Sequence, residues 1–234
     1  MNVQGTTIGE ASYETDRMQF IGRQRTLAAP AAFDGKSPLS NTAGPVLDLA
    51  SGTGDVALAI AGRAVTGADF CLDMLALARS KARPGNRLAE ARARRHAALW
   101  AAGDALALPF RSASFAAVTV AFGVRNFADL AVGLQEIRRV LVDRGVLAIL
   151  EFQRPRRRWM GLGMQLWNRL VVTPVGRLLS DDPAAYSYLP ASVATFPDAG
   201  ELPKQVAAAG FAPLSSRELS GGIVALTVAR REGR

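Results

Sequence analysis

A glycine-rich stretch between two acidic residues is the part of the sequence best suited to ligand chemistry. It reads DLASGTGD over residues 48–55, directly after a short apolar run. Glycines permit a tight turn and let a ligand approach the backbone, and the N-terminus of a following helix offers free N–H groups. Gly52, Gly54 and Ala57 also satisfy the G-x-G-x-x-A pattern of dinucleotide-binding proteins, so this stretch alone leaves the ligand open.

Three aspartates lie at the ends of runs that predict strands, and they narrow the choice of ligand. Asp48 lies within the end of the first run, where its carboxylate suits an ammonium group better than a pyrophosphate. Asp69 ends the second run, where a carboxylate accepts hydrogen bonds from both ribose hydroxyls. Asp104 follows the third, where it can accept from an adenine amine with the small Ala105 beside the ring. An ammonium group, a ribose and an adenine are parts of S-adenosylmethionine, so the three aspartates together favour this ligand. The alternatives are that Asp69 caps a helix and that Asp104 is a loop residue that binds no ligand.

A sheet is needed to bring these side chains to one place. Apolar runs predict strands, mostly parallel, at 46–50, 64–69, 98–102, 114–122 and 146–152. Helical patterns alternate with them at 55–63, 72–83 and 130–141. Two last strands, at 211–218 and 222–228, predict a terminal hairpin. We expect an α/β fold with a doubly wound, Rossmann-like sheet, and a ligand at the carboxyl ends of its strands, beside the first.

Composition bounds the class of protein. The chain has 234 residues, of which 49% are hydrophobic and 21% charged, which fits one α/β domain and argues against disorder. The single cysteine, Cys71, and the single histidine, His96, leave no material for a zinc site or a Ser-His-Asp triad, so no metal is expected. No apolar run of about 18 residues lacks a charge. Without a signal-peptide pattern either, we expect a cytoplasmic protein.

Several longer segments carry a resemblance to a known family. They are VLDLASGTGD, ADFCLDML, GDALALPF, AFGVRNFADL, RVLVDRGVLAILEFQRP, AYSYLPASVATFPDAGEL and GGIVALTV. From about residue 45 to 230 they resemble the ubiquinone/menaquinone biosynthesis C-methyltransferases, a family of class I S-adenosylmethionine-dependent methyltransferases. The FGVRNF and YLPxSxxxFP segments are specific to this family within that fold. The resemblance implies a seven-stranded sheet with a C-terminal antiparallel strand.

The resemblance also implies an activity and a set of contacts. The expected reaction is methylation of a ring carbon of a polyprenylated quinol, in menaquinone or ubiquinone biosynthesis, with S-adenosylmethionine as the methyl donor. Besides Asp48 and the glycine turn, the cofactor contacts are carried over to Thr53, Asp69, Asp104 and Ala105. A further contact, commonly a serine in the family, falls on Ala121, so its hydrogen bond is absent here.

The Arg-Asn pair of the family's substrate side falls on Arg125 and Asn126. An aromatic ring carbon attacks a methyl group more readily once the adjacent hydroxyl has lost its proton, and a fixed cation stabilises the resulting phenolate. We therefore expect Arg125 to stabilise the phenolate and Asn126 to orient the hydroxyl. The alternative is a loop that caps the next helix.

The segment after the fifth predicted strand suggests how the protein contacts a lipid substrate. A cluster of arginines at 154–158 precedes an apolar stretch with Trp159 and Trp167, and two interpretations stay open. The stretch lies on the inner face of a membrane, or it covers the substrate pocket. Nucleic acid is not expected as a partner, because aromatic residues are not interleaved with the arginine clusters, and homodimer formation is left open.

The chain is expected to form one methyltransferase domain. Its parts are a lead-in at 1–44, a cofactor-binding core at 45–152, a substrate-side helical insert at 153–210 and a strand pair at 211–230. The family's Lys-Pro-Gly-Gly turn is VDRG at 142–145, where Gly145 is expected to make the turn. Three other functions stay open: methylation of a soluble aromatic metabolite, a non-catalytic adenosyl-binding scaffold, and a nicotinamide oxidoreductase, against which Asp48 argues.

Overall fold

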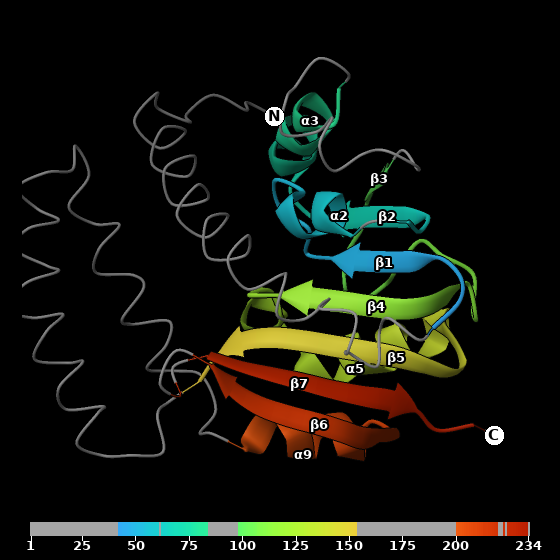
Figure 1. Cartoon of the computed structure of the whole chain (residues 1–234), viewed down its shortest axis with the longest axis vertical. Coiled ribbons are helices and arrows are strands. Elements are labelled where there is room, and N and C mark those ends of the chain that lie inside the picture. The colour runs from blue at the N-terminus through green and yellow to red at the C-terminus, as the bar shows by residue number, and fades with distance from the viewer. Residues whose placement is uncertain are drawn as a thin grey trace, which may run out of the picture.

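A seven-stranded sheet forms the centre of the protein (Figure 1). The computed structural model describes residues 42–60, 62–83, 98–153, 200–219, 222 and 224–233. In chain order the strands are β1 (Val46–Leu49), β2 (Val65–Asp69), β3 (Leu99–Ala102), β4 (Phe115–Ala121), β5 (Leu141–Phe152), β6 (Phe211–Leu219) and β7 (Val224–Arg231). Their spatial order is β3-β2-β1-β4-β5-β7-β6.

The first five strands are parallel, and β7 runs antiparallel to both of its neighbours, β5 and β6. The expected doubly wound, mostly parallel sheet with a C-terminal antiparallel strand is therefore confirmed. The order of the strands reverses between β1 and β4, since the chain leaves β1 toward β2 on one side and returns as β4 on the other. In sheets of this kind, ligands bind where the order reverses, at the carboxyl ends of the strands.

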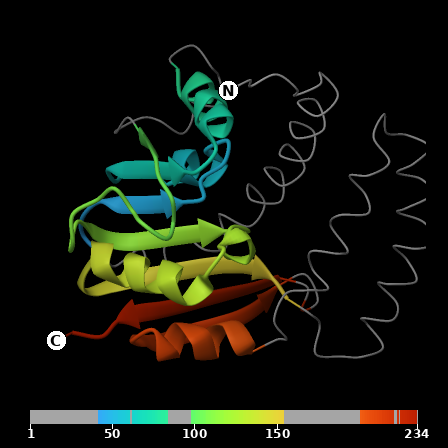
Figure 2. The same ribbon diagram turned by 180° about the vertical axis from the view of Figure 1, so that it is seen from behind.

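Helices cover the sheet and explain why its central strands are apolar on both faces. They are α2 (Asp55–Ala59), α3 (Leu72–Lys81), α5 (Leu130–Val140) and α9 (Glu201–Ala208). All seven residues of β4 are buried. The helices α5 and α9 lie on the face seen in Figure 2. Leu134, Ile137 and Val140 form the buried side of α5, and the Asp129 side chain caps its start by accepting from the Val132 N–H.

The start of β5 differs from the expectation. A strand was expected from Val146, but β5 begins at Leu141, and its register with β4 shifts between Phe115 and Ala117. Gly145 does not take the left-handed conformation; Arg144 does, with a φ of 61°. The expected turn at Gly145 was therefore wrong. The glycine is needed for space instead, because a Cβ at this position would lie 2.9 Å from the carbonyl oxygen of Val142.

Several expectations fall outside the described residues. They concern His96, the cluster at 154–158, the apolar stretch with both of its tryptophans, and nearly all of the lead-in at 1–44. Among the helices that the structure describes, none has the length and apolar character needed to cross a membrane.

Candidate functional site

Asp69, at the carboxyl end of β2, links the glycine turn to the start of α3. Its Oδ2 accepts from the Gly52 N–H at 2.7 Å, and its Oδ1 accepts from the Cys71 N–H at 2.9 Å. Gly52 and Gly54 take left-handed conformations, with φ of 56° and 79°, as expected for a tight turn. Asp69 is half-buried, and each carboxylate oxygen retains a lone pair for a further donor. The carboxylate therefore keeps acceptor capacity for a ligand hydroxyl, and the expected role of Asp69 stays a prediction.

Asp48 lies within the end of β1, as expected, with its side chain in the interior. The residue is 1% exposed; its Oδ1 accepts from the Thr119 hydroxyl at 2.8 Å and its Oδ2 from the Ala57 N–H at 3.0 Å. Both oxygens are thus bonded to protein donors in the interior, and the expected contact with an ammonium group stays a prediction. Asp48 joins β1 to β4 and to the first turns of α2, and so supports the glycine turn from behind.

Thr53 belongs to a small polar cluster that includes Lys81, a residue the sequence did not single out. The Thr53 hydroxyl donates to Asp55 Oδ2 at 2.7 Å and accepts from Lys81 Nζ at 2.8 Å. Lys81 Nζ also lies 3.1 Å from Asp55 Oδ1. Lys81 comes from the last turn of α3, and only tertiary packing brings it to the glycine turn, so no local signal could have identified it.

Trp100 on β3 explains part of the glycine pattern. A Cβ at Gly54 would lie 2.4 Å from Cη2 of this tryptophan, and a Cβ at Gly67 would lie 2.4 Å from its Cζ3. The indole therefore fills space that both glycines leave open. Gly54 thus serves the packing of α2 against β2 and β3 as well as the turn, which is a further reason why the G-x-G spacing does not identify a ligand.

Asp104 follows β3 and lies at the strand end next to Asp69, as expected. The side chain is exposed, and Oδ1 accepts from the Leu106 N–H at 2.9 Å. The Gly103 N–H donates to the carbonyl oxygen of Asp69 at 3.1 Å, which holds the two strand ends together. Ala105 packs half-buried against the core. The structure thus brings Asp69, Asp104 and Ala105 to one edge of the sheet.

Ala121, the last residue of β4, has no polar side chain to offer the cofactor. Ala121 is 6% exposed and packs in an apolar cluster. The next residue, Phe122, has a φ of 54°, and Ala50 at the end of β1 has the same value. Gly123 lies so close to Ala50 that a Cβ on the glycine would be 2.5 Å from the alanine Cβ. Non-glycine residues rarely adopt this conformation, and two such turns meet here at the point where the strand order reverses.

Arg125 lies in the short 3-10 helix η2 (Val124–Asn126) and is not a free cation. Its Nη1 donates to Glu151 Oε1 at 2.6 Å, and its side chain is 5% exposed. The guanidinium also lies over Phe152, with 5.5 Å between Cζ and the ring centroid. The expected stabilisation of a phenolate by Arg125 stays a prediction, and the structure shows its guanidinium bonded to the buried carboxyl group of Glu151. Asn126, in contrast, is exposed.

Glu151, at the end of β5, is a second residue that sequence reasoning missed. Its side chain is 1% exposed, and Oε1 also accepts from the Phe152 N–H at 3.0 Å. Burial raises the pKa of the Glu151 carboxyl above its ordinary value, and the nearby charge of Arg125 opposes that shift. Nε of Arg125 is buried without a hydrogen-bond partner in the described part of the chain. An acidic residue directly after the apolar run at 146–150 was the available signal.

Comparison with known proteins identifies the family of this chain. The model of the ubiE/COQ5 methyltransferase family matches residues 32–231. A protein of Thermus thermophilus named demethylmenaquinone methyltransferase is 45% identical over 190 residues, which cover 80% of this chain and 82% of the relative. One of the same name from Deinococcus radiodurans is 40% identical over 211 residues, 88% of this chain and 80% of the relative.

Two further matches are less informative. The solved structure of a SAM-dependent methyltransferase from Thermotoga maritima has a TM-score of 0.60 at 19% identity, covers 94% of this chain and 95% of its own, and shows the shared fold. A model of the glycosyl hydrolase 94 supersandwich domain matches residues 1–61, most of which lie outside the described residues.

Proposed function

Because this chain belongs to the ubiE/COQ5 methyltransferase family, we propose that it methylates a ring carbon of demethylmenaquinol with S-adenosylmethionine as the methyl donor. The observation that carries the choice of substrate is the 45% identity, over 82% of its length, to a relative named demethylmenaquinone methyltransferase. The ubiquinone precursor is the related substrate within the same family. The finer proposals below assign roles to residues of this chain.

The strand ends fit an adenosyl group. Asp69 is half-buried and Asp104 is exposed, on neighbouring strands, and each carboxylate keeps acceptor capacity beyond its backbone donors. We assign Asp69 to the ribose hydroxyls, and Asp104 with Ala105 to the adenine. The glycine turn, with Thr53, would hold the amino-acid end, and Asp48 supports that turn from the interior. When bound, the cofactor supplies a methyl group activated by a positive sulfur.

On the substrate side, we assign Asn126 rather than Arg125 to the substrate hydroxyl. Asn126 is exposed at the carboxyl end of β4, and its amide offers both a donor and an acceptor. Arg125 is a positioning residue: its backbone N–H and its guanidinium both bond to Glu151, so the pair fixes the short helix that carries Asn126. Correct orientation of the two reactants supplies most of the rate enhancement in a displacement of this kind.

A polyprenyl tail and contact with a membrane surface belong to the same proposal. Their support is the sequence alone: the arginines at 154–158 precede an apolar stretch with Trp159 and Trp167. Basic residues near an anionic lipid surface each contribute about 1 kcal/mol to binding. A stretch that only covers the pocket would make activity independent of lipid or detergent.

A methyl-transfer assay with mass-spectrometric detection tests the function. The full chain is given labelled S-adenosylmethionine with chemically reduced demethylmenaquinone in detergent and, separately, with the reduced ubiquinone precursor. We expect one labelled methyl group on the demethylmenaquinol ring. Binding of the cofactor without methylation of either quinol would overturn the assignment of substrate and favour a soluble aromatic metabolite.

The variant Asp69→Ala separates an enzyme from a scaffold. We expect it to weaken cofactor binding and to lower methyl transfer at limiting cofactor concentration. Asp73→Ala, which changes an exposed acidic residue in the first turn of α3, is the matched control and should behave as the wild type. Biological function that survives Asp69→Ala without cofactor binding would identify a non-catalytic role.

A further inference from the structure

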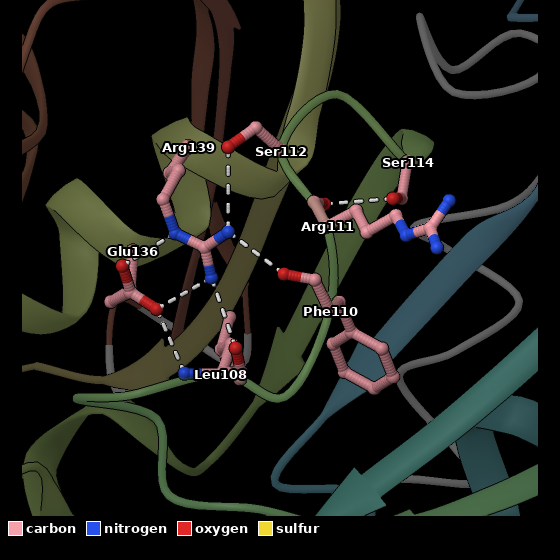
Figure 3. A network of polar contacts seen from close by, with 7 residues as sticks. All are labelled: Leu108, Phe110, Arg111, Ser112, Ser114, Glu136 and Arg139. Carbon is pink, nitrogen blue, oxygen red and sulfur yellow. Dashed lines mark hydrogen bonds and ion pairs between the residues drawn. The ribbon is translucent and has the colours of Figure 1, made fainter.

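Arg139, in the last turn of α5, joins that helix to the segment that follows β3 (Figure 3). Its Nη1 donates to the carbonyl oxygen of Phe110 at 2.8 Å, and its Nη2 donates to that of Leu108 at 2.9 Å. Nη1 also lies 3.5 Å from the Ser112 hydroxyl. The segment between β3 and β4 contains no helix, so these contacts replace the hydrogen bonds that regular structure would provide.

Glu136, three residues earlier on the same helix, completes the arrangement. Its Oε1 accepts from Arg139 Nε at 2.7 Å, and its Oε2 accepts from Nη2 at 2.8 Å. Oε2 also accepts from the Leu108 N–H at 2.8 Å, as Figure 3 shows. Glu136 thus binds the N–H of Leu108, and Arg139 binds its carbonyl oxygen. The hydrogen bond from Arg139 lowers the pKa of Glu136, so the carboxylate stays charged at a lower pH than an ordinary glutamate does.

Asp104 forms a turn with the residues directly before Leu108. The carbonyl oxygen of Asp104 accepts from the Ala107 N–H at 3.1 Å, and its Oδ1 accepts from the Leu106 N–H. The side chain of Leu108, the residue after Ala107, is buried in the core with 5% exposure. The segment is therefore fixed at its start by the contact of Gly103 with β2 and farther along by Arg139.

We propose that Glu136 and Arg139 are positioning residues that set the affinity for the adenosyl group without touching it. They hold the segment so that Asp104 and Ala105 already face the ligand before it binds. A segment without this support would lose conformational freedom on binding, and the affinity would fall accordingly. The inference rests on the proposed function, since it takes the ligand of Asp104 to be S-adenosylmethionine.

The contacts distinguish this pair from an ordinary surface ion pair, which contributes little. Arg139 donates to two peptide carbonyl oxygens as well as to Glu136, and Glu136 accepts a peptide N–H. The fork of a guanidinium can make these contacts together, whereas a lysine ammonium group cannot reproduce their geometry. Arg138, the neighbouring residue, points elsewhere: its Nε donates to the carbonyl oxygen of Gly210 at 3.4 Å.

Calorimetric titration of S-adenosylmethionine into the full chain tests the proposal, with methyl-transfer kinetics as a second readout. In Arg139→Gln we expect Kd and the KM for the cofactor to rise by about tenfold or more, which corresponds to 1.4 kcal/mol or more. At saturating cofactor, kcat should stay near the wild-type value. The Kd of Arg139→Lys should lie between those of the wild type and Arg139→Gln. Arg138→Gln is the matched control, and its Kd should be unchanged.

Amide hydrogen exchange gives a readout that does not depend on activity. We expect faster exchange at the Leu108 N–H, and in peptides covering 104–110, in Arg139→Gln and Glu136→Gln but not in Arg138→Gln. If Arg139→Gln does not fold, Glu136→Gln decides the question by the same two measurements.

The outcomes separate this inference from the function on which it rests. A folded Arg139→Gln protein with reduced thermal stability and an unchanged Kd would show a merely structural role and overturn the inference alone. A wild-type chain that does not bind S-adenosylmethionine would overturn the proposed function itself.

Discussion

Arg125 and Glu151 form an ion pair at the carboxyl ends of β4 and β5, with 2.6 Å between Nη1 and Oε1. The backbone N–H of Arg125 also approaches the same carboxylate, at 3.4 Å from Oε2. The pair therefore attaches η2 to the carboxyl end of β5 at two points. It links the short helix that carries Asn126 to a buried strand of the sheet.

A double-mutant cycle tests whether these two charges depend on each other. Arg125→Met and Glu151→Leu should each lower the free energy of unfolding by about 3–5 kcal/mol, because each leaves one buried charge without its partner. The double variant should lose much less than the sum. Urea denaturation measures all four free energies, and additive losses would contradict the pairing.

The interior carboxylate of Asp48 gives a second test. Asp48→Ala removes the acceptor for both the Ala57 N–H and the Thr119 hydroxyl, and each buried donor left without an acceptor costs about 1–3 kcal/mol. Thr119→Val removes one of these contacts and should cost less. Asp48→Asn, which can accept from one group and donate to the other, should retain most of the stability. Equal losses in the three variants, measured by chemical denaturation, would exclude this account.

The fit of Trp100 against Gly67 gives a third test, free of the backbone effects expected at Gly54. Gly67→Ala should destabilise the fold by about 1–3 kcal/mol, because the new methyl group overlaps the indole. Combining it with Trp100→Leu should cost less than the two separate losses together, since the smaller side chain makes room. Thermal unfolding followed by circular dichroism measures each variant. A Gly67→Ala chain as stable as the wild type would show that the indole can move aside.

The dependence of stability on pH should reveal Glu136. Its pKa is lower in the folded chain than its ordinary value of about 4.3, so the folded state binds the proton less tightly than the unfolded state does. The resulting stabilisation is present above that ordinary value and is lost as the pH falls through the lowered pKa. The difference in unfolding free energy between wild type and Glu136→Gln should therefore shrink on acidification. A difference that stays constant from neutral to acid pH would contradict this prediction.

The sequence predicted the sheet well because buried parallel strands are short apolar runs between polar turns. The ends of β1, β2, β3 and β4 differ from the expected runs by no more than one residue. The early start of β5 at Leu141 was missed because it depends on a shifted register with β4, which local sequence does not record. The hairpin was expected, but nothing in its residues showed that β7 rather than β6 would lie beside β5.

The site also contains residues whose positions the sequence predicted and residues whose contacts it did not. Asp69 and Asp104 lie where they were expected, because topology alone brings strand ends together. The protein partners of Asp48 and Arg125 were not predicted, since Thr119 and Glu151 belong to other strands and local sequence does not record which side chains pack together.

The place of β7 in the sheet has a consequence for biosynthesis. This strand follows all the others in the chain, yet it lies between β5 and β6 and pairs with both. Until residues 224–231 emerge from the ribosome, the apolar edge of β5 has no partner, and an open edge readily pairs with other chains. A nascent chain halted after β6 would be an aggregation-prone species, because the strand that joins the two parts of the sheet is synthesised last.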